Sequence, residues 1–210
     1  MKLYLIRHGR QDSPLCNVDV PLCEAGCRQA QLLGKRLEQY QIDALYSSAL
    51  IRAVQTAEII NEHLHLEHNI IPQLREISFG ELEGMREEDI QTQYRDFLME
   101  RREMSSDLPY PKGESGQMVY KRVYPVIQNI LQTQATNVAI VTHGGVIRAV
   151  LAGILGIDMA KKLMFAKELE NTSITQIDYH GDYQYFTVER INDYAHIEQQ
   201  EQLLRKYFKR

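Results

Sequence analysis

The 210-residue sequence has few cysteines, no long apolar run and no excess of positive charge, and each absence argues against a class of protein. Its cysteines, Cys16, Cys23 and Cys27, are an odd number bunched near the start, so reduced thiols are expected rather than a disulfide framework. Their spacing also fits no common zinc site, which needs a fourth ligand and usually a Cys-x-x-Cys pair. We therefore expect no metal there.

Apolar runs are short throughout the chain. The longest, residues 146–157, is interrupted by Arg148 and two glycines, whereas a membrane-spanning helix needs roughly 20 apolar residues. The apolar start, residues 1–6, ends at Arg7 and is too short for the core of a signal peptide. We expect a soluble, cytoplasmic protein with no membrane partner.

The formal net charge of −4 gives no overall basic field that would attract nucleic acid or anionic lipid. An anionic substrate would therefore have to be bound by a local group of arginines. The basic C-terminal residues 204–210 are interpreted as a solvated tail rather than a nucleic-acid or membrane contact. The length and the 44% hydrophobic content favour one globular domain, residues 1–210. The sequence leaves its oligomeric state open between a monomer and a homodimer.

Apolar periodicity predicts strands that alternate with helices. The expected strands are residues 2–6, 43–46 and 137–142, followed by a hairpin of 173–179 and 185–191. The expected helices are residues 24–40, about 50–64, a segment through Ile90, Tyr94 and Phe97, 118–129, and 144–155. This alternation predicts an α/β fold, with a mostly parallel sheet inside a three-layer α/β/α arrangement.

Three segments carry more specific expectations. Pro125 should kink or split the helix that contains it. Residues 104–116 are the best loop candidate, and such a loop often closes over a site. In residues 194–210, Ile197, Leu204 and Phe208 are spaced to dock against the fold.

Two histidines each follow a predicted strand and precede a glycine: His8, and His143 before Gly144. Ligands of open parallel sheets bind beyond the carboxyl ends of the strands, so both imidazoles should face one crevice. Arg7 and Arg52 could bind a phosphoryl group through paired, charge-assisted hydrogen bonds. Each residue taken alone could be structural, but together they favour a phosphate site.

The sequence resembles the histidine phosphatase superfamily, the phosphoglycerate mutase-like group, and within it broad-specificity and α-ribazole phosphatases. The matching stretches, in the family's order, are LIRHG (5–9), DVPLCEAGCRQAQLLGKRL (19–37), YSSALIRAVQTAEII (46–60), LREISFGELEG (74–84), PKGES (111–115) and VTHGGVIRAVL (141–151). A bare Arg-His-Gly is a weak signal, whereas this ordered set is specific.

The resemblance implies a role for each matching residue. His8 corresponds to the nucleophile that becomes phosphorylated, and Arg7, Arg52 and His143 correspond to its phosphate pocket. Glu76 corresponds to the acid that protonates the leaving oxygen. That assignment depends on the family stretch alone, because other glutamates crowd nearby.

The chemistry is consistent with these roles. A neutral imidazole can attack phosphorus when a backbone carbonyl holds its other N–H. Arginines placed in advance stabilise the charge that spreads over the equatorial oxygens, so neither a metal nor a cofactor is required. Gly144 would supply a backbone donor, and Ser115 and Asn171 lie in stretches that resemble less firmly assigned family positions.

The sequence departs from the family pattern at the rim of the expected pocket. Arg10 and Gln11 replace an acidic or amide residue followed by a hydroxyl residue, and we count both as candidate substrate-binding residues. The Arg10 side chain is expected to point into solvent, the alternative being a contact to a second anionic group. Pro14, Cys23 and Leu82 replace a frequent asparagine, a threonine and a tryptophan.

The histidines at 63, 65 and 68 suggest either a metal site or a surface turn after a helix, and the turn is favoured.

Three functions remain open: a phosphomonoester hydrolase of small phosphorylated metabolites, a phosphoglycerate mutase, and a catalytically silent module that binds phosphorylated ligands. The compact connection between Glu76 and His143 favours hydrolysis over the mutase.

Overall fold

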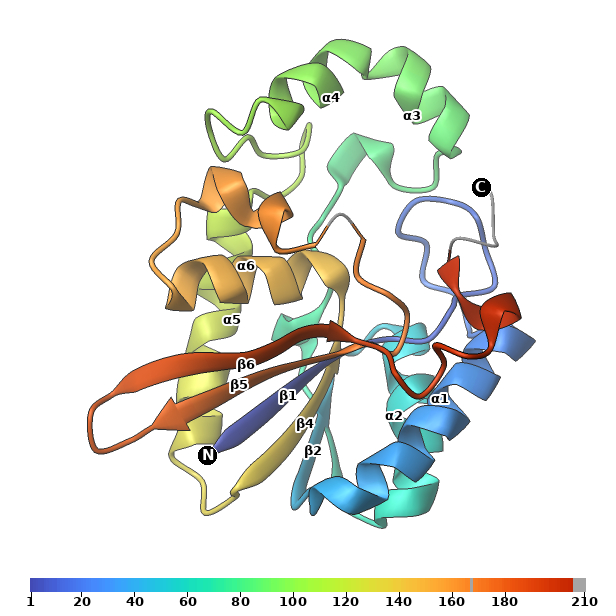
Figure 1. The fold of residues 1–210 in the computed structure, drawn as a ribbon. Helices are drawn as coiled ribbons and strands as arrows, with labels where there is room; N and C mark the ends of the chain where they lie inside the picture. The colour runs from blue at the N-terminus through green and yellow to red at the C-terminus, as the bar shows by residue number, and fades with distance from the viewer. Residues whose placement is uncertain (167, 206–210) are drawn as a thin grey trace.

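The computed structural model describes residues 1–166 and 168–205. Its centre is a six-stranded sheet in the order β3-β2-β4-β1-β5-β6, with helices on both faces (Figure 1). The strands are β1 (Lys2–Arg7), β2 (Ala44–Ser47), β3 (His68–Ile70), β4 (Asn137–Thr142), β5 (Ile174–His180) and β6 (Tyr185–Asp193). The α-helices are α1 (Glu24–Leu37), α2 (Ile51–Leu64), α3 (Glu87–Gln93), α4 (Arg95–Arg102), α5 (Gly116–Leu131) and α6 (Gly144–Ile154).

The predicted mostly parallel sheet is confirmed. Strand β4 pairs in parallel with β1 and β2, and β2 pairs in parallel with β3, whereas the hairpin β5–β6 adds an antiparallel edge. In the β1–β4 pair, Arg7 lies opposite Thr142. The residues that follow these two strands, His8 and His143, therefore leave the sheet at the same edge and side by side.

The three-layer arrangement follows from the alternation of side chains along the strands. In β1, Leu3 and Leu5 pack into the cluster formed with α5 and α6, and Tyr4 and Ile6 pack into the cluster formed with α1 and α2. Both clusters are fully buried at their centres. Each face of the sheet therefore has its own helical layer.

Two predicted helices differ in the structure. The segment through Ile90 forms two helices, α3 and α4, which break at Tyr94, where φ is −114°. Helix α4 buries no residue, so no continuous apolar face supports one straight helix. Conversely, α5 runs unbroken past Pro125, so the expected split is wrong. Because Pro125 is exposed, water can hydrate the carbonyl that loses its helical partner.

The C-terminal segment docks as predicted for two of its three apolar residues. Ile197 and Leu204 are buried with Leu203 against α1, and Phe208 lies outside the described residues, as do residues 206–210 of the predicted basic tail. Residues 104–115 form the predicted loop between α4 and α5. In the described parts of the chain, no helix is both long and apolar enough to cross a membrane. That residues 1–210 form a single domain stays a prediction.

Candidate active site

Two buried imidazoles lie at the carboxyl edge of the sheet. The rings of His8 and His143 have centroids 5.0 Å apart and planes inclined by 54°. His8 is 4% exposed and His143 is fully buried. The backbone N–H of His8 donates to the carbonyl of Thr142, at 2.9 Å, and so ties the two strand ends together. The sequence prediction that both imidazoles face one crevice relied on this parallel pairing of β1 with β4.

The tautomer of His8 is set by its own loop. Its Nδ1 lies 2.6 Å from the carbonyl oxygen of Gly9, and because a carbonyl can only accept, Nδ1 carries the hydrogen. Nε2 is then unprotonated, and it accepts a hydrogen bond from Nε of Arg52 at 3.3 Å. Burial lowers the pKa of His8 well below its ordinary value, and the neighbouring His143, Arg52 and Arg7 side chains lower it further. The imidazole is therefore neutral, with a lone pair on Nε2.

The backbone of the His8 loop is fixed by two side chains. The amide of Asn171 donates to the carbonyl of His8 at 2.9 Å, and the N–H of Gly9 donates to the hydroxyl of Thr56 at 2.9 Å. A Cβ at Gly9 would lie 2.7 Å from the carbonyl oxygen of Gly26, which explains the glycine. Asn171, a less firmly assigned position in the sequence, thus holds the loop that carries His8.

Arg52 lies in the first turn of α2 and is 2% exposed. Its Nη1 donates to the carbonyl of Val18 at 3.0 Å, and its Nη2 donates to the side-chain oxygen of Asn17 at 2.8 Å. Asn17 was missed by sequence reasoning, which noted only that Pro14 replaces a usual asparagine. The loop brings Asn17 to Arg52 with a left-handed backbone, φ 46°, a conformation that asparagine tolerates better than most residues.

Arg7 reaches across the start of α6. Its guanidinium donates to the carbonyl of Leu169, and a Cβ at Gly144 would lie 3.8 Å from its Nε. His143 immediately precedes this helix, with Nε2 2.8 Å from the hydroxyl of Ser48. Burial lowers the pKa of His143 well below its ordinary value, and Arg52 and Arg7 lower it further. The first turn of α6 thus lies beside Arg7 and directly follows His143, two residues of the predicted phosphate pocket.

The carboxylate of Glu76 sits at the N-terminus of α6. The N–H of Gly145 donates to Oε1 at 3.0 Å and to Oε2 at 3.3 Å, and the N–H of Ile77 donates to Oε1 at 2.9 Å. A Cβ at Gly145 would lie 2.5 Å from Oε1, so the close approach requires glycine. These backbone donors hold the carboxyl group of Glu76 at the start of α6.

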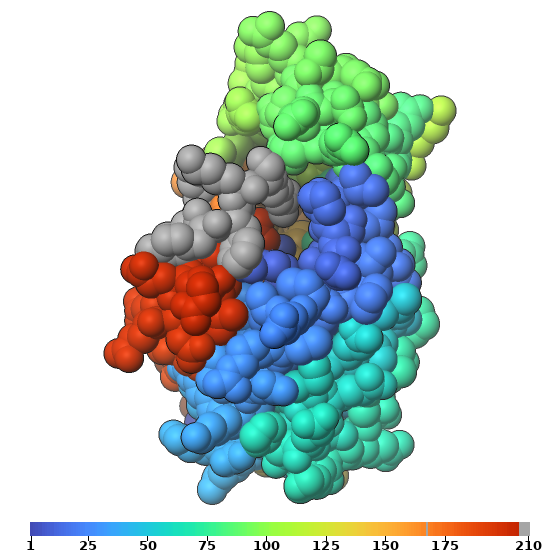
Figure 2. All heavy atoms as spheres, turned by 90° about the vertical axis from the view of Figure 1, so that its right-hand side faces the viewer, coloured from blue at the N-terminus to red at the C-terminus, as the bar shows by residue number. Residues whose placement is uncertain are grey.

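These side chains meet in a cavity of about 1040 Å³, and Figure 2 shows its mouth between the blue N-terminal loop and the green α3–α4 segment. Of the predicted site residues, those that line it are Arg7, His8, Arg10, Gln11, Arg52 and Glu76. His143 and Gly144 are not among the lining residues; His143 packs against His8, and Gly144 lies beside Arg7. Apolar side chains from the α3–α4 region form another wall: Phe79, Leu82, Ile90, Leu98 and Tyr110.

The rim residues are held by their own chain. Nη2 of Arg10 donates to the carbonyl of Leu203 at 3.0 Å, so the expectation that Arg10 points into solvent is wrong. The docked C-terminal segment supplies that acceptor, which sequence spacing does not reveal. The amide of Gln11 donates to the carbonyls of Ser13 and Leu15 and so orders the loop beside the cavity.

The histidines near residue 65 lie away from this cavity. Nδ1 of His63 is 2.6 Å from a carboxylate oxygen of Glu38, and Nε2 of His68 is 2.7 Å from the hydroxyl of Ser47. His63 belongs to α2 and His68 begins β3, so the predicted surface turn is confined to residues 65–67 between them. In residues 1–166 and 168–205, no group of three or more His, Cys, Asp or Glu side chains could hold a metal ion.

Comparison with known proteins decides the family. The sequence model of the histidine phosphatase superfamily (branch 1) matches residues 3–194. The chain belongs to that superfamily. The predicted fold class and the predicted enzyme class, histidine phosphatase, are thereby confirmed.

Relatives of this histidine phosphatase include both phosphatases and a mutase. An uncharacterized phosphatase, PhoE, of Bacillus subtilis is 34% identical over 73% of this chain and 77% of its own length. A 2,3-bisphosphoglycerate-dependent phosphoglycerate mutase of Protochlamydia amoebophila is 30% identical over 79% and 91%. A mycobacterial glucosyl-3-phosphoglycerate phosphatase has a similar structure, with a TM-score of 0.84 at 25% identity over 91% and 98% of the two chains. Family membership implies a small phosphorylated substrate.

Proposed function

We propose that the protein hydrolyses phosphomonoesters of small metabolites through a phosphohistidine on His8. The observation that carries this proposal is the neutral His8 imidazole, whose Nδ1–H is held by Gly9 and whose Nε2 lies beside Arg52 in the cavity. A nucleophile at phosphorus needs that free electron pair together with a positive charge on the phosphoryl oxygens.

In the first step the Nε2 lone pair of His8 attacks phosphorus in line with the ester bond. The N–P bond forms, the P–O bond breaks, and its electron pair leaves on the ester oxygen. Protonated Glu76 gives that oxygen a proton, so an alcohol leaves. Arg7 and Arg52 hold the equatorial oxygens, where negative charge develops.

In the second step Glu76 works in the opposite direction. Its carboxylate takes a proton from a water molecule, and the oxygen of that water attacks the phosphohistidine. The P–O bond forms, the N–P bond breaks, and its electron pair returns to Nε2 of His8. Inorganic phosphate is released, and Glu76 again carries the proton it needs for the next cycle.

The charge balance around the cavity favours hydrolysis over the mutase reaction. Beyond Arg7 and Arg52, the lining contributes the cations Arg10 and Arg205, and Arg205 already pairs with Glu168 at 3.3 Å. The acidic side chains of the same lining, apart from Glu76, are Asp12, Glu24, Glu87 and Glu168. A phosphoglycerate carries a second anionic group, and this rim offers it no surplus of positive charge.

The test is phosphate release in EDTA from p-nitrophenyl phosphate and from a panel of metabolite phosphates, with 3-phosphoglycerate included. We expect release of inorganic phosphate without added metal, and no conversion of 3-phosphoglycerate to its 2-phospho isomer. Isomer formation without phosphate release would favour the mutase. Inactivity across the whole panel would leave the silent binding module as the better explanation.

A further inference from the structure

A nearly buried ion pair lies behind the segment that carries Glu76. Nε of Arg122, on α5, donates to Oε1 of Glu114 at 2.8 Å, and Nη2 donates to Oε2 at 2.9 Å. The two side chains are 14% and 12% exposed. Burying two opposite charges gains little stability by itself, because desolvation offsets their attraction. The burial of this pair is therefore better explained by the other groups that Arg122 and Glu114 bind.

Both partners hold the backbone on either side of Glu76. Arg122 donates through Nη1 to the carbonyl of Gln73 at 2.6 Å, and through Nη2 to the carbonyl of Glu76 itself at 2.9 Å. Oε2 of Glu114 accepts the N–H of Ser78 at 2.9 Å, and the N–H of Glu114 donates to the carbonyl of Ser78 at 2.9 Å. Residues 73–78 are thus fixed before, at and after the proposed acid.

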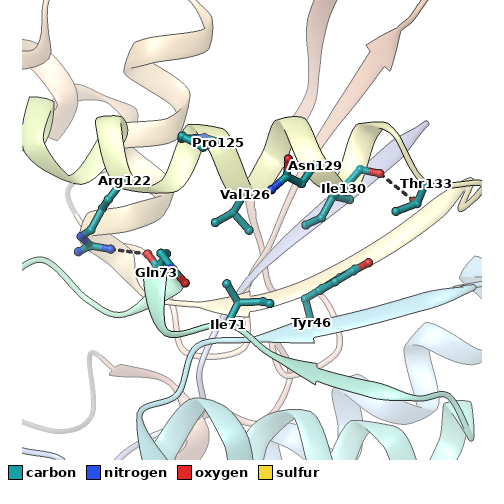
Figure 3. Close-up of a pocket in the computed structure, with 9 residues that line it drawn as sticks. All are labelled: Tyr46, Ile71, Gln73, Arg122, Pro125, Val126, Asn129, Ile130 and Thr133. Atoms are coloured by element: carbon teal, nitrogen blue, oxygen red, sulfur yellow. Dashed lines mark hydrogen bonds between the residues drawn. The ribbon is translucent and has the colours of Figure 1, made fainter.

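The approach to Gln73 is visible in Figure 3, where Arg122 reaches from α5 to its carbonyl at one end of a groove of about 390 Å³. Neither Arg122 nor Glu114 is among the residues that line the larger cavity with His8. They therefore do not touch a substrate bound there, and their hydrogen bonds reach the site through the backbone of Glu76 and its neighbours. The charge of Arg122 also helps to lower the pKa of His143, and Arg122→Lys keeps that charge while it removes the forked contacts.

We propose that Arg122 and Glu114 are positioning residues, which hold the Glu76 backbone where its carboxyl group reaches the leaving oxygen. This inference rests on the proposed function. Proton transfer requires hydrogen-bond distance to the ester oxygen, and a misplacement of about 1 Å can cost about 100-fold in rate. Arginine is required because its planar guanidinium donates hydrogen bonds to Glu114, Gln73 and Glu76 at the same time. The compact ammonium group of a lysine cannot reach all three acceptors.

The first test measures kcat and KM of Arg122→Met and Arg122→Lys on a series of phosphate esters with increasingly basic leaving groups. We expect a small loss for p-nitrophenyl phosphate, whose leaving group needs little protonation. For alkyl phosphates we expect kcat to fall by roughly 10- to 100-fold with KM nearly unchanged. Glu114→Gln should show a smaller effect of the same kind, and it serves as the test if the Arg122 variants do not fold.

The matched control is Arg36→Met. Arg36 forms a similarly shielded pair with Asp193 at 2.6 Å, with side chains 18% and 20% exposed, but it lies outside the segment that carries Glu76. We expect this variant to be less stable, with an unchanged dependence on leaving group. If Arg122→Met lost activity equally on all esters, its dependence on leaving group would be unchanged, as expected for the control. That result would overturn the proposal.

A double variant separates this inference from the proposed function. If Arg122 acts through Glu76, then adding Arg122→Met to Glu76→Gln leaves the dependence on leaving group as it is in Glu76→Gln alone. Effects that multiply would overturn the positioning role. If Glu76→Gln slows all esters equally, Glu76 is not the acid, and that part of the proposed function fails rather than the positioning role of Arg122 alone.

Discussion

At the scale of single residues, two backbone groups set the chemistry of the site. The carbonyl of Gly9 keeps the hydrogen of His8 on Nδ1, and the N–H of Gly145 holds the carboxylate of Glu76. Both glycines lie where a side chain would collide with a neighbouring oxygen atom. The placement of His8 and Glu76 therefore depends on two positions at which a Cβ would force a neighbouring group to move.

The low pKa of His8 predicts an unusual pH profile. A histidine whose pKa is lowered by burial and by neighbouring cations stays unprotonated below pH 6.5, so it remains a nucleophile there. We expect kcat/KM, corrected for ionisation of the substrate phosphate, to stay level between pH 7 and 5.5. A tenfold fall per pH unit beginning near 6.5 would contradict a neutral, buried His8.

Gly145→Ala should disturb Glu76 without touching His8. The new Cβ would lie 2.5 Å from Oε1 of Glu76 and must displace the carboxyl group. We expect alkyl phosphate turnover to fall about 10-fold or more, with a smaller loss for p-nitrophenyl phosphate. The control is Gly181→Ala in the β5–β6 turn, where the nearest atom, on Tyr179, is 3.7 Å away and activity should not change. Equal losses for both substrates would show a general structural effect.

At the scale of elements, the C-terminal segment links the far end of the chain to the rim of the site. The carbonyl of Leu203 accepts hydrogen bonds from Arg10 and from Gln29 of α1, and Ile197 is fully buried beneath it. Arg10 is two residues from His8, so the docking of this segment and the shape of the cavity rim are joined.

Ile197→Ala should therefore destabilise the protein. Removing a fully buried isoleucine side chain costs about 2–5 kcal/mol, measured as the loss in free energy of unfolding by urea titration. The control Ile157→Ala, at a position 38% exposed, should change the free energy of unfolding by less than about 1 kcal/mol. If Ile197→Ala lost no more free energy of unfolding than the control, the C-terminal segment would add nothing to the core.

At the scale of the whole molecule, the sequence predicted what repeats locally. The short apolar run of residues 2–6 indicated a buried strand, and the two strand-end histidines indicated the site, because both signals depend on short stretches of sequence and on parallel pairing. The contacts of Asn17 with Arg52 and of Arg122 with Glu76 join segments that are far apart in the sequence and depend on the shapes of loops. The spacing of residues in the sequence therefore could not predict them. The helix break at Tyr94 was missed because an i, i+4, i+7 pattern does not show that α4 lacks a buried face.

Stability as a function of pH is a property of the whole fold. Burial, and to a lesser degree Arg36, lowers the pKa of His196 to about 4, against about 6.5 in the unfolded chain. The unfolded state binds more protons between these values, so stability falls as the pH drops from 6.5 towards 4. Between pH 6.5 and 5 we expect His196 alone to account for about 1.5 kcal/mol.

The control for that loss is His196→Gln, which keeps a donor near Thr172 but has no titrating group. Urea unfolding of this variant should show a free energy that falls less between pH 6.5 and 5 than that of the unmodified protein. The same pH dependence in both proteins would show that His196 is not held neutral.

The most direct measurement is a rapid quench of the enzyme in detergent at mildly alkaline pH during turnover of a substrate labelled on phosphorus, followed by mapping of the bound label. The account predicts brief incorporation of an alkali-stable, acid-labile phosphate on His8, and none in His8→Ala, which should also lack turnover. Label on a serine or cysteine, or unchanged labelling in His8→Ala, would contradict it.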